Sequence, residues 1–271
     1  MSKIFTITDY KFPVFYGDTI IINEPEEDNP HILSPYRTFK EGPYKYLVYH
    51  VTTRGKTLRE FIAEINKPPE RRSFRSSLRR QGHVRINPLD LLIKLIDAYE
   101  DMLQKNRLLS QSHINPDLIW IDYDVNNNIT VKLLDIMDYD VAKEDINETM
   151  YLSPELLGKR NHLMYMISSD SKDKHTTIQK RPSLNRYDTR PSTLSSVYSL
   201  GLVLYFIVNN ADPYEGSRIH ANERPHLTYT SPLYSKLIWI ATNDNPKERP
   251  TLKEFREIVI NTRHPKTGLC C

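Results

Sequence analysis

The pattern of apolar positions is most continuous in the stretch Leu194–Val208, whose second half is apolar on every face. A helix of this kind is buried on all sides or lies in a membrane. The stretch is shorter than the roughly 20 residues that a membrane-spanning helix needs. We therefore predict a buried central helix, with Ser195 and Ser196 as candidate N-caps and a stop at residues 209–213. A buried strand is the alternative, and the length of the run favours the helix.

Shorter patterns predict the remaining elements. Apolar residues at helical spacing predict helices over residues 58–65, 89–108, 232–243 and 252–261, the first with a capping box formed by Thr57 and Glu60. Branched and aromatic runs between turn residues predict strands over residues 4–7, 19–22, 32–39, 44–51, 118–121 and 130–134. The third and fourth of these strands, and the last two, are predicted to form hairpins. The chain is thus expected to be α+β and mostly helical after its first 51 residues.

Charge is unevenly distributed, although the 271-residue chain carries a formal net charge of only +3. Residues 67–85 hold seven Lys or Arg against one Glu, and residues 159–190 hold eight Lys or Arg against three Asp. These segments correspond to two basic insertions, 67–86 and 158–192, in an otherwise acidic body. Such a distribution indicates either contact with an acidic surface or solvated loops without a partner.

The two cysteines, Cys270 and Cys271, are adjacent, so they offer neither a disulfide framework nor a CxxC metal pair. This usage fits a reducing compartment, and the first ten residues lack the apolar core of a signal peptide. We therefore expect a cytoplasmic location without a transmembrane segment. The Cys-Cys pair does not match the CaaX pattern, and we do not expect it to be lipidated.

Several short motifs, in order, resemble those of eukaryotic protein kinases over about residues 29–261. The run from Asn29 to Phe39 is similar to the family's fourth strand, and Tyr46–Val51 to the fifth strand and hinge. The motifs that follow resemble the first helix of the C-terminal lobe (residues 57–62), the APE segment (residues 151–155), the start of the central helix (residues 196–201) and the RPT segment (residues 245–251). Each match is weak alone, but their order is that of the family.

The resemblance implies a kinase-like fold with a reduced N-lobe, residues 1–51, and a C-lobe, residues 52–271, that carries the two insertions. Only 28 residues precede the fourth-strand match, too few for three full strands and a helix. The family pairs the APE glutamate with the RPT arginine inside the C-lobe. The resemblance therefore implies a structural ion pair between Glu155 and Arg249, with Tyr49, His50 and Val51 as the hinge.

The family's catalytic groups have no clear counterparts here. Aligned on Pro116, the catalytic-loop aspartate, lysine and asparagine correspond to His113, Asn115 and Leu118. Aligned on His113 instead, the aspartate becomes Asn115 and the asparagine becomes Trp120. Both registers lose the proton acceptor and the magnesium ligand, because neither Leu nor Trp offers an oxygen to a hard cation.

Other parts of the transfer machinery are also missing from the sequence. One glycine, Gly17, precedes Asn29, so no glycine-rich loop is possible there, and neither Lys3 nor Lys11 lies in the strand context that the family uses. The DFG aspartate survives as Asp135, for which we expect a structural role. The aspartate that braces the catalytic loop in the family is replaced by Ser196.

We therefore expect a pseudokinase, without cofactor or turnover, that acts as a scaffold or assembly component through contacts with other proteins. Arginines of the first insertion are the candidate partner-binding residues: Arg71, Arg72, Arg75, Arg79 and Arg80. An acidic cytoskeletal or regulatory surface would suit them. The alternatives are an atypical, ATP-binding active kinase and a protein that binds nucleic acid through its basic insertions.

Overall fold

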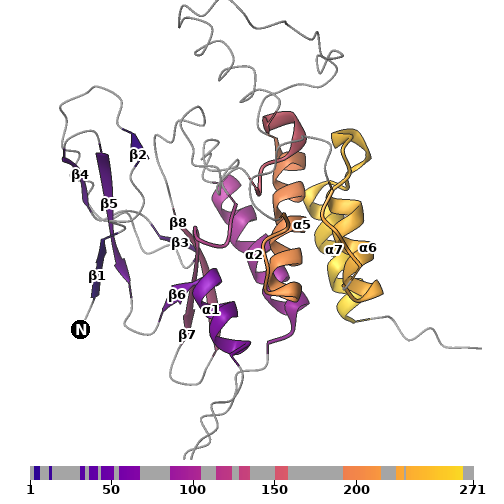
Figure 1. The fold of residues 1–271 in the computed structure, drawn as a ribbon, viewed down its shortest axis with the longest axis horizontal. Coiled ribbons are helices and arrows are strands. Elements are labelled where there is room, and N and C mark those ends of the chain that lie inside the picture. The colour runs from indigo at the N-terminus through magenta and orange to yellow at the C-terminus, as the bar shows by residue number, and fades with distance from the viewer. Residues whose placement is uncertain are drawn as a thin grey trace, which may run out of the picture.

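The structure, a computed structural model, places two small sheets beside a group of helices (Figure 1). It describes residues 3–6, 12–13, 31–33, 37–41, 44–51, 55–67, 86–104, 114–123, 128–134, 150–157, 192–214, 224–228 and 230–264. The first sheet lies at one end, the second sheet lies in the middle with one short helix, and the longer helices lie at the other end. The predicted α+β architecture with a mostly helical C-terminal part is confirmed.

The first sheet is built on β5 (Tyr44–Val51), whose bounds match the prediction. Its partners, all antiparallel, are β1 (Lys3–Thr6), β2 (Phe12–Pro13) and β4 (Arg37–Glu41). Glu41 pairs with Tyr44, so β4 and β5 form the predicted hairpin. The predicted strand at residues 19–22 lies outside the described residues.

The second sheet has the order β3 (Ile32–Leu33), β8 (Ile129–Leu134), β7 (Ile119–Tyr123) and β6 (Lys56–Thr57). The β7–β8 hairpin was predicted; the short strand β6 was not. A single strand over residues 32–39 was wrong, because β3 pairs in parallel with β8 while β4 belongs to the first sheet. Pro35 lies between them and has no backbone N–H for a continuous ladder. The lobe boundary at residue 51 stays a prediction, and β3 pairs across it.

Helices and the turns around them form the rest of the described chain, and α5 lies between the others (Figure 1). Their bounds are α1 (Leu58–Ile65), α2 (Pro88–Gln104), α5 (Thr193–Asn209), α6 (Pro232–Ala241), the 3-10 turn η3 (Pro246–Glu248) and α7 (Leu252–Arg263). The first begins with the predicted capping box of Thr57 and Glu60. None of the described helices is long and apolar enough to span a bilayer.

The ends of α5 are fixed by side chains that bond to the backbone. Ser192 is the N-cap, and its hydroxyl accepts from the backbone N–H of Ser195 at 3.3 Å. The prediction of Ser195 or Ser196 as N-cap was wrong, because the helix begins one turn earlier and both residues are buried inside it. The helix ends at Asn209, and its C-cap Asn210 has a φ of 50°, a left-handed conformation that asparagine tolerates.

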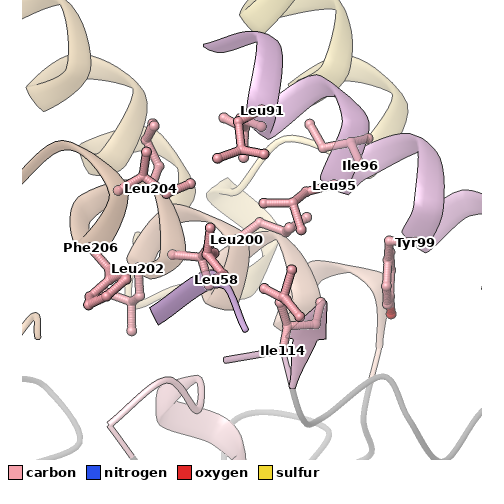
Figure 2. Packing of buried hydrophobic residues seen from close by; sticks show 14 of the residues in the cluster. Leu58, Leu91, Leu95, Ile96, Tyr99, Ile114, Leu200, Leu202, Leu204 and Phe206 are labelled. Carbon is pink, nitrogen blue, oxygen red and sulfur yellow. The ribbon is translucent and has the colours of Figure 1, made fainter. Parts of the chain in front are cut away.

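The core gathers around α5, as its apolar pattern predicted. Leu200, Leu202 and Phe206 of α5 belong to one cluster with Leu58 of α1 and Leu95 of α2 (Figure 2). Fully burying a side chain of this size contributes about 1.5–3 kcal/mol. Because residues on all faces of α5 are buried, it fixes the helices and loops that carry the site.

Candidate functional site

The best-defined polar feature is the ion pair between Glu155 and Arg249, which the structure brings together. Nη1 of Arg249 lies 2.7 Å from Oε1 of Glu155, and Nη2 lies 2.9 Å from Oε2. The side chain of Arg249 is 0% exposed and that of Glu155 is 2% exposed. Oε1 also accepts from the hydroxyl of Ser195 at 2.8 Å. A bidentate pair with this extra donor leaves little of either charge uncompensated.

Arg249 joins three separate stretches of chain through its other contacts. Its Nε donates to the carbonyl of Asn243 at 2.6 Å, and Nη1 donates to the carbonyl of Leu194 at 3.1 Å. Its guanidinium also lies over the ring of Tyr198, 4.8 Å from the centroid. The pair therefore ties residues 150–157 to the start of α5 and to the turn before α7.

The same pair gives the fold a pH dependence. Burial raises the pKa of Glu155, but the hydrogen bonds and charge of Arg249 outweigh it, so this pKa is lowered overall. A carboxylate with a lowered folded-state pKa stabilises the protein above its unfolded pKa, and this stabilisation is lost as the pH falls through the folded value. We expect the stability difference between wild type and Glu155→Gln to be constant near neutral pH and to shrink below about pH 4.3.

Urea unfolding of both proteins at several pH values between neutral and acidic measures this difference. A gap that stays unchanged at the lowest pH at which both proteins fold contradicts a lowered pKa.

The predicted catalytic-loop segment is a tight turn leading into β7. Asn115 is 5% exposed, and its side-chain oxygen accepts from the backbone N–H groups of Asp117 and Leu118 at 2.9 and 3.1 Å. The side chain of Leu118 is buried, and its carbonyl accepts from the N–H of Leu134 in β8. The amide oxygen of Asn115 thus shapes the turn, and the side chain of Leu118 is buried in it. His113 lies outside the described residues.

Trp120, the other candidate for the asparagine position, packs against Gly55. Its backbone pairs with Thr57 across β6 and β7, and its side chain is 4% exposed. A Cβ placed on Gly55 would lie 2.2 Å from Nε1 of the indole. The close approach therefore requires glycine at this position.

Ser196, at the position of the family's bracing aspartate, links two helices. Its hydroxyl lies 2.5 Å from that of Tyr99 on α2, and it donates to the carbonyl of Ser192 at 3.3 Å. Burial raises the pKa of Tyr99 despite this hydrogen bond, so the phenol stays protonated. A neutral hydroxyl therefore stands at the position that the motif resemblance aligns with the family's carboxylate.

A second charged centre was not predicted. Nε of Arg59 lies 2.8 Å from Oδ1 of Asp117, and its two Nη atoms each lie 3.1 Å from an oxygen of Asp212. Tyr151 donates to Oδ1 of Asp212 at 2.7 Å, and the Arg59 guanidinium lies 5.0 Å from the centroid of Phe206. We call these five residues the Arg59 centre.

The pKa shifts in the Arg59 centre keep Arg59 and Tyr151 protonated. Burial lowers the pKa of Arg59, but hydrogen bonds to Asp117 and Asp212 outweigh it and raise this pKa overall. Burial, followed by the nearby charge of Asp212, raises the pKa of Tyr151. Arg59 thus joins α1 to the turn before β7 and to the end of α5. No local pattern could have revealed contacts between residues 58 and 153 positions apart.

For the remaining predicted site residues, the structure describes the backbone of three and does not describe the others. The backbones of Tyr49, His50 and Val51 pair with β1. The others lie outside the described residues: Asp135, Arg71, Arg72, Arg75, Arg79, Arg80, Cys270 and Cys271. Within the described part of the chain, no group of three or more His, Cys, Asp or Glu residues could hold a metal ion.

Comparison with known proteins found similarity to two probable LIM domain-containing serine/threonine-protein kinases of Dictyostelium discoideum. The chain is 24% identical to one and 23% identical to the other, in each case over 93% of its length. The aligned region is 34% of the first relative and 23% of the second, so the chain spans about a third and a quarter of their lengths. No family model matches the chain.

Among solved structures, the chain is similar to the kinase domain of Mycobacterium tuberculosis PknI. The TM-score is 0.49 at 15% sequence identity, covering 87% of this chain and 73% of that one.

Proposed function

Because the chain is a member of the protein kinase-like superfamily, we propose that it is a catalytically inactive member that works as a scaffold or assembly component. The turn between Asn115 and Leu118 carries this proposal. In one alignment Leu118 stands where a magnesium ligand is needed, and its side chain is apolar and buried. In the other the position belongs to Trp120, which also has no oxygen to offer.

The described residues of this turn therefore do not offer the ligands that a magnesium nucleotide needs. Magnesium prefers oxygen ligands in octahedral geometry, usually one or two carboxylates together with substrate phosphates. The side-chain oxygen of Asn115 already accepts two backbone hydrogen bonds. Asp117, the carboxylate in this turn, is paired with Arg59. Ser196 in place of the bracing aspartate also supports an inactive protein.

A protein of this kind acts through its surface. The basic insertions suit an acidic protein surface, cytoskeletal or regulatory, and this partner class is part of the proposal. Binding to nucleic acid through the same insertions remains the sequence-based alternative.

The second candidate function is that of an active serine/threonine kinase. The descriptions of the two Dictyostelium relatives favour it, since both are probable kinases. Asp135, at the DFG position, is the carboxylate that such an enzyme would use for its metal.

A nucleotide titration separates the two candidates. We expect Mg-ATP to leave the melting temperature unchanged, whereas a ligand at 100 times its Kd stabilises a protein by about 2.7 kcal/mol. The matched variant is Asp135→Asn. A thermal shift in the wild type that this variant abolishes would favour the kinase, and phosphate transfer to any protein substrate would overturn the scaffold proposal.

A further inference from the structure

The outer face of α6 exposes two large apolar side chains. Leu233 is 47% exposed and Trp239 is 53% exposed, and no other large hydrophobic residue among those described is exposed to this degree. Leu233, Lys236 and Trp239 lie three positions apart, so they share one side of the helix. The opposite side is buried through Leu237 and Ile238. We call these three exposed residues, together with Arg224, the α6 face.

Trp239 is held in place rather than loose. The guanidinium of Arg224 lies 4.0 Å from the centroid of its indole, a cation–π contact. Arg224 is fixed in turn by Asp244, whose Oδ2 lies 3.6 Å from its Nε. A side chain ordered before binding loses less conformational entropy when a partner docks. Tryptophan and arginine are also the residue types enriched at energetic centres of protein interfaces.

The charge of the α6 face is positive. The helix sequence, PLYSKLIWIA, contains Lys236 and no acidic residue. Lys236 is exposed and makes no ion pair with any residue that the structure describes. An unpaired ammonium group between two exposed apolar side chains complements a carboxylate flanked by apolar residues.

We propose that the α6 face binds an acidic, amphipathic segment of a partner protein. Apolar side chains of that segment contact Leu233 and Trp239, and its carboxylates face Lys236. This proposal rests on the proposed scaffold function, because the α6 face would be one of the surfaces through which a scaffold contacts its partners. The residues of this face are different from those of the basic insertions, so the chain would use two sets of residues to contact its partners.

Fluorescence anisotropy with a designed peptide tests the proposal on the full chain. The probe is a labelled helical peptide of about 15 residues, with leucines at i, i+4 and i+7 and glutamates beside them. A second probe replaces each glutamate with glutamine. We expect the acidic peptide to bind more tightly than its neutral counterpart, and Trp239→Ala or Lys236→Glu to weaken it by about tenfold or more.

The matched control is Lys253→Glu, which makes the same change of charge at an exposed lysine on α7. It should leave the affinity within about twofold of the wild type. Circular dichroism melts verify that each variant is folded, as expected for surface substitutions.

Two results of the peptide titrations overturn the proposal: neither probe binds the wild type, or Lys236→Glu and Lys253→Glu weaken binding equally. Two other occupants of the face would also overturn it. These are a single-stranded oligonucleotide that binds there instead, or a second copy of the chain in a dimer that Trp239→Ala dissociates. These results are independent of the nucleotide titration. A chain that transfers phosphate and still binds the acidic peptide through α6 refutes the scaffold function alone. A chain inert to Mg-ATP that binds neither probe refutes the α6 proposal alone.

Discussion

Replacing Arg249 with methionine is expected to lower the free energy of unfolding by about 3–5 kcal/mol. The substitution leaves the carboxylate of Glu155 buried with the hydroxyl of Ser195 as its remaining side-chain partner. It also removes donors from the carbonyls of Asn243 and Leu194. Several kcal/mol is a large share of the stability of an ordinary domain, so much of the variant should be unfolded at physiological temperature.

Urea unfolding followed by circular dichroism measures this loss, with two matched variants. Arg256→Met removes an arginine from a partly exposed pair with Asp97 and should cost less than about 1 kcal/mol. The double variant Glu155→Leu/Arg249→Met removes both buried charges and should recover much of the stability. If Arg249→Met costs no more than Arg256→Met, the buried pair does not organise this part of the fold.

Local signals explain which elements could be predicted. The start of α1 follows from its capping box, and the start of β5 follows from a branched, aromatic run after Gly42 and Pro43. Each signal lies within a few residues of the element that it defines. The error at residues 32–39 has the opposite origin. Ile32 pairs with Leu133, about 100 residues away, and nothing in the local sequence encodes that partner.

The site divides in the same way. The pairing of Glu155 with Arg249 could be expected because ordered motifs placed both residues in a known family pattern. Neither the Arg59 centre nor the α6 face had such a motif. Arg59 acquires two carboxylates through tertiary packing, and the exposure of Trp239 depends on how α6 lies on α5.

Adding a methyl group at Gly55 is expected to displace the indole of Trp120 and to cost about 1–3 kcal/mol of stability. The new Cβ would lie 2.2–2.8 Å from three atoms of a side chain that is 4% exposed. The ring cannot yield cheaply because β6 and β7 fix its backbone. The chain has two tryptophans, so Trp239→Phe makes the emission spectrum report on Trp120 alone. Gly55→Ala should shift that emission to longer wavelength as the indole meets water.

The control measures Gly55→Ala in a Trp120→Leu background. It separates the steric clash with the indole from the other effects of replacing glycine. In that background the added methyl group finds space, and Gly55→Ala should be neutral or stabilise by about 0.4–1 kcal/mol through the unfolded chain. Equal costs in the two backgrounds would contradict the packing of Trp120 on Gly55.

The Trp120→Leu variant also tests the proposed function. It removes the bulk of the indole but adds no oxygen to the turn at Asn115 and Leu118. If missing metal ligands make the protein inactive, Trp120→Leu should remain unresponsive to Mg-ATP, whereas binding in this variant would identify the indole as the obstacle.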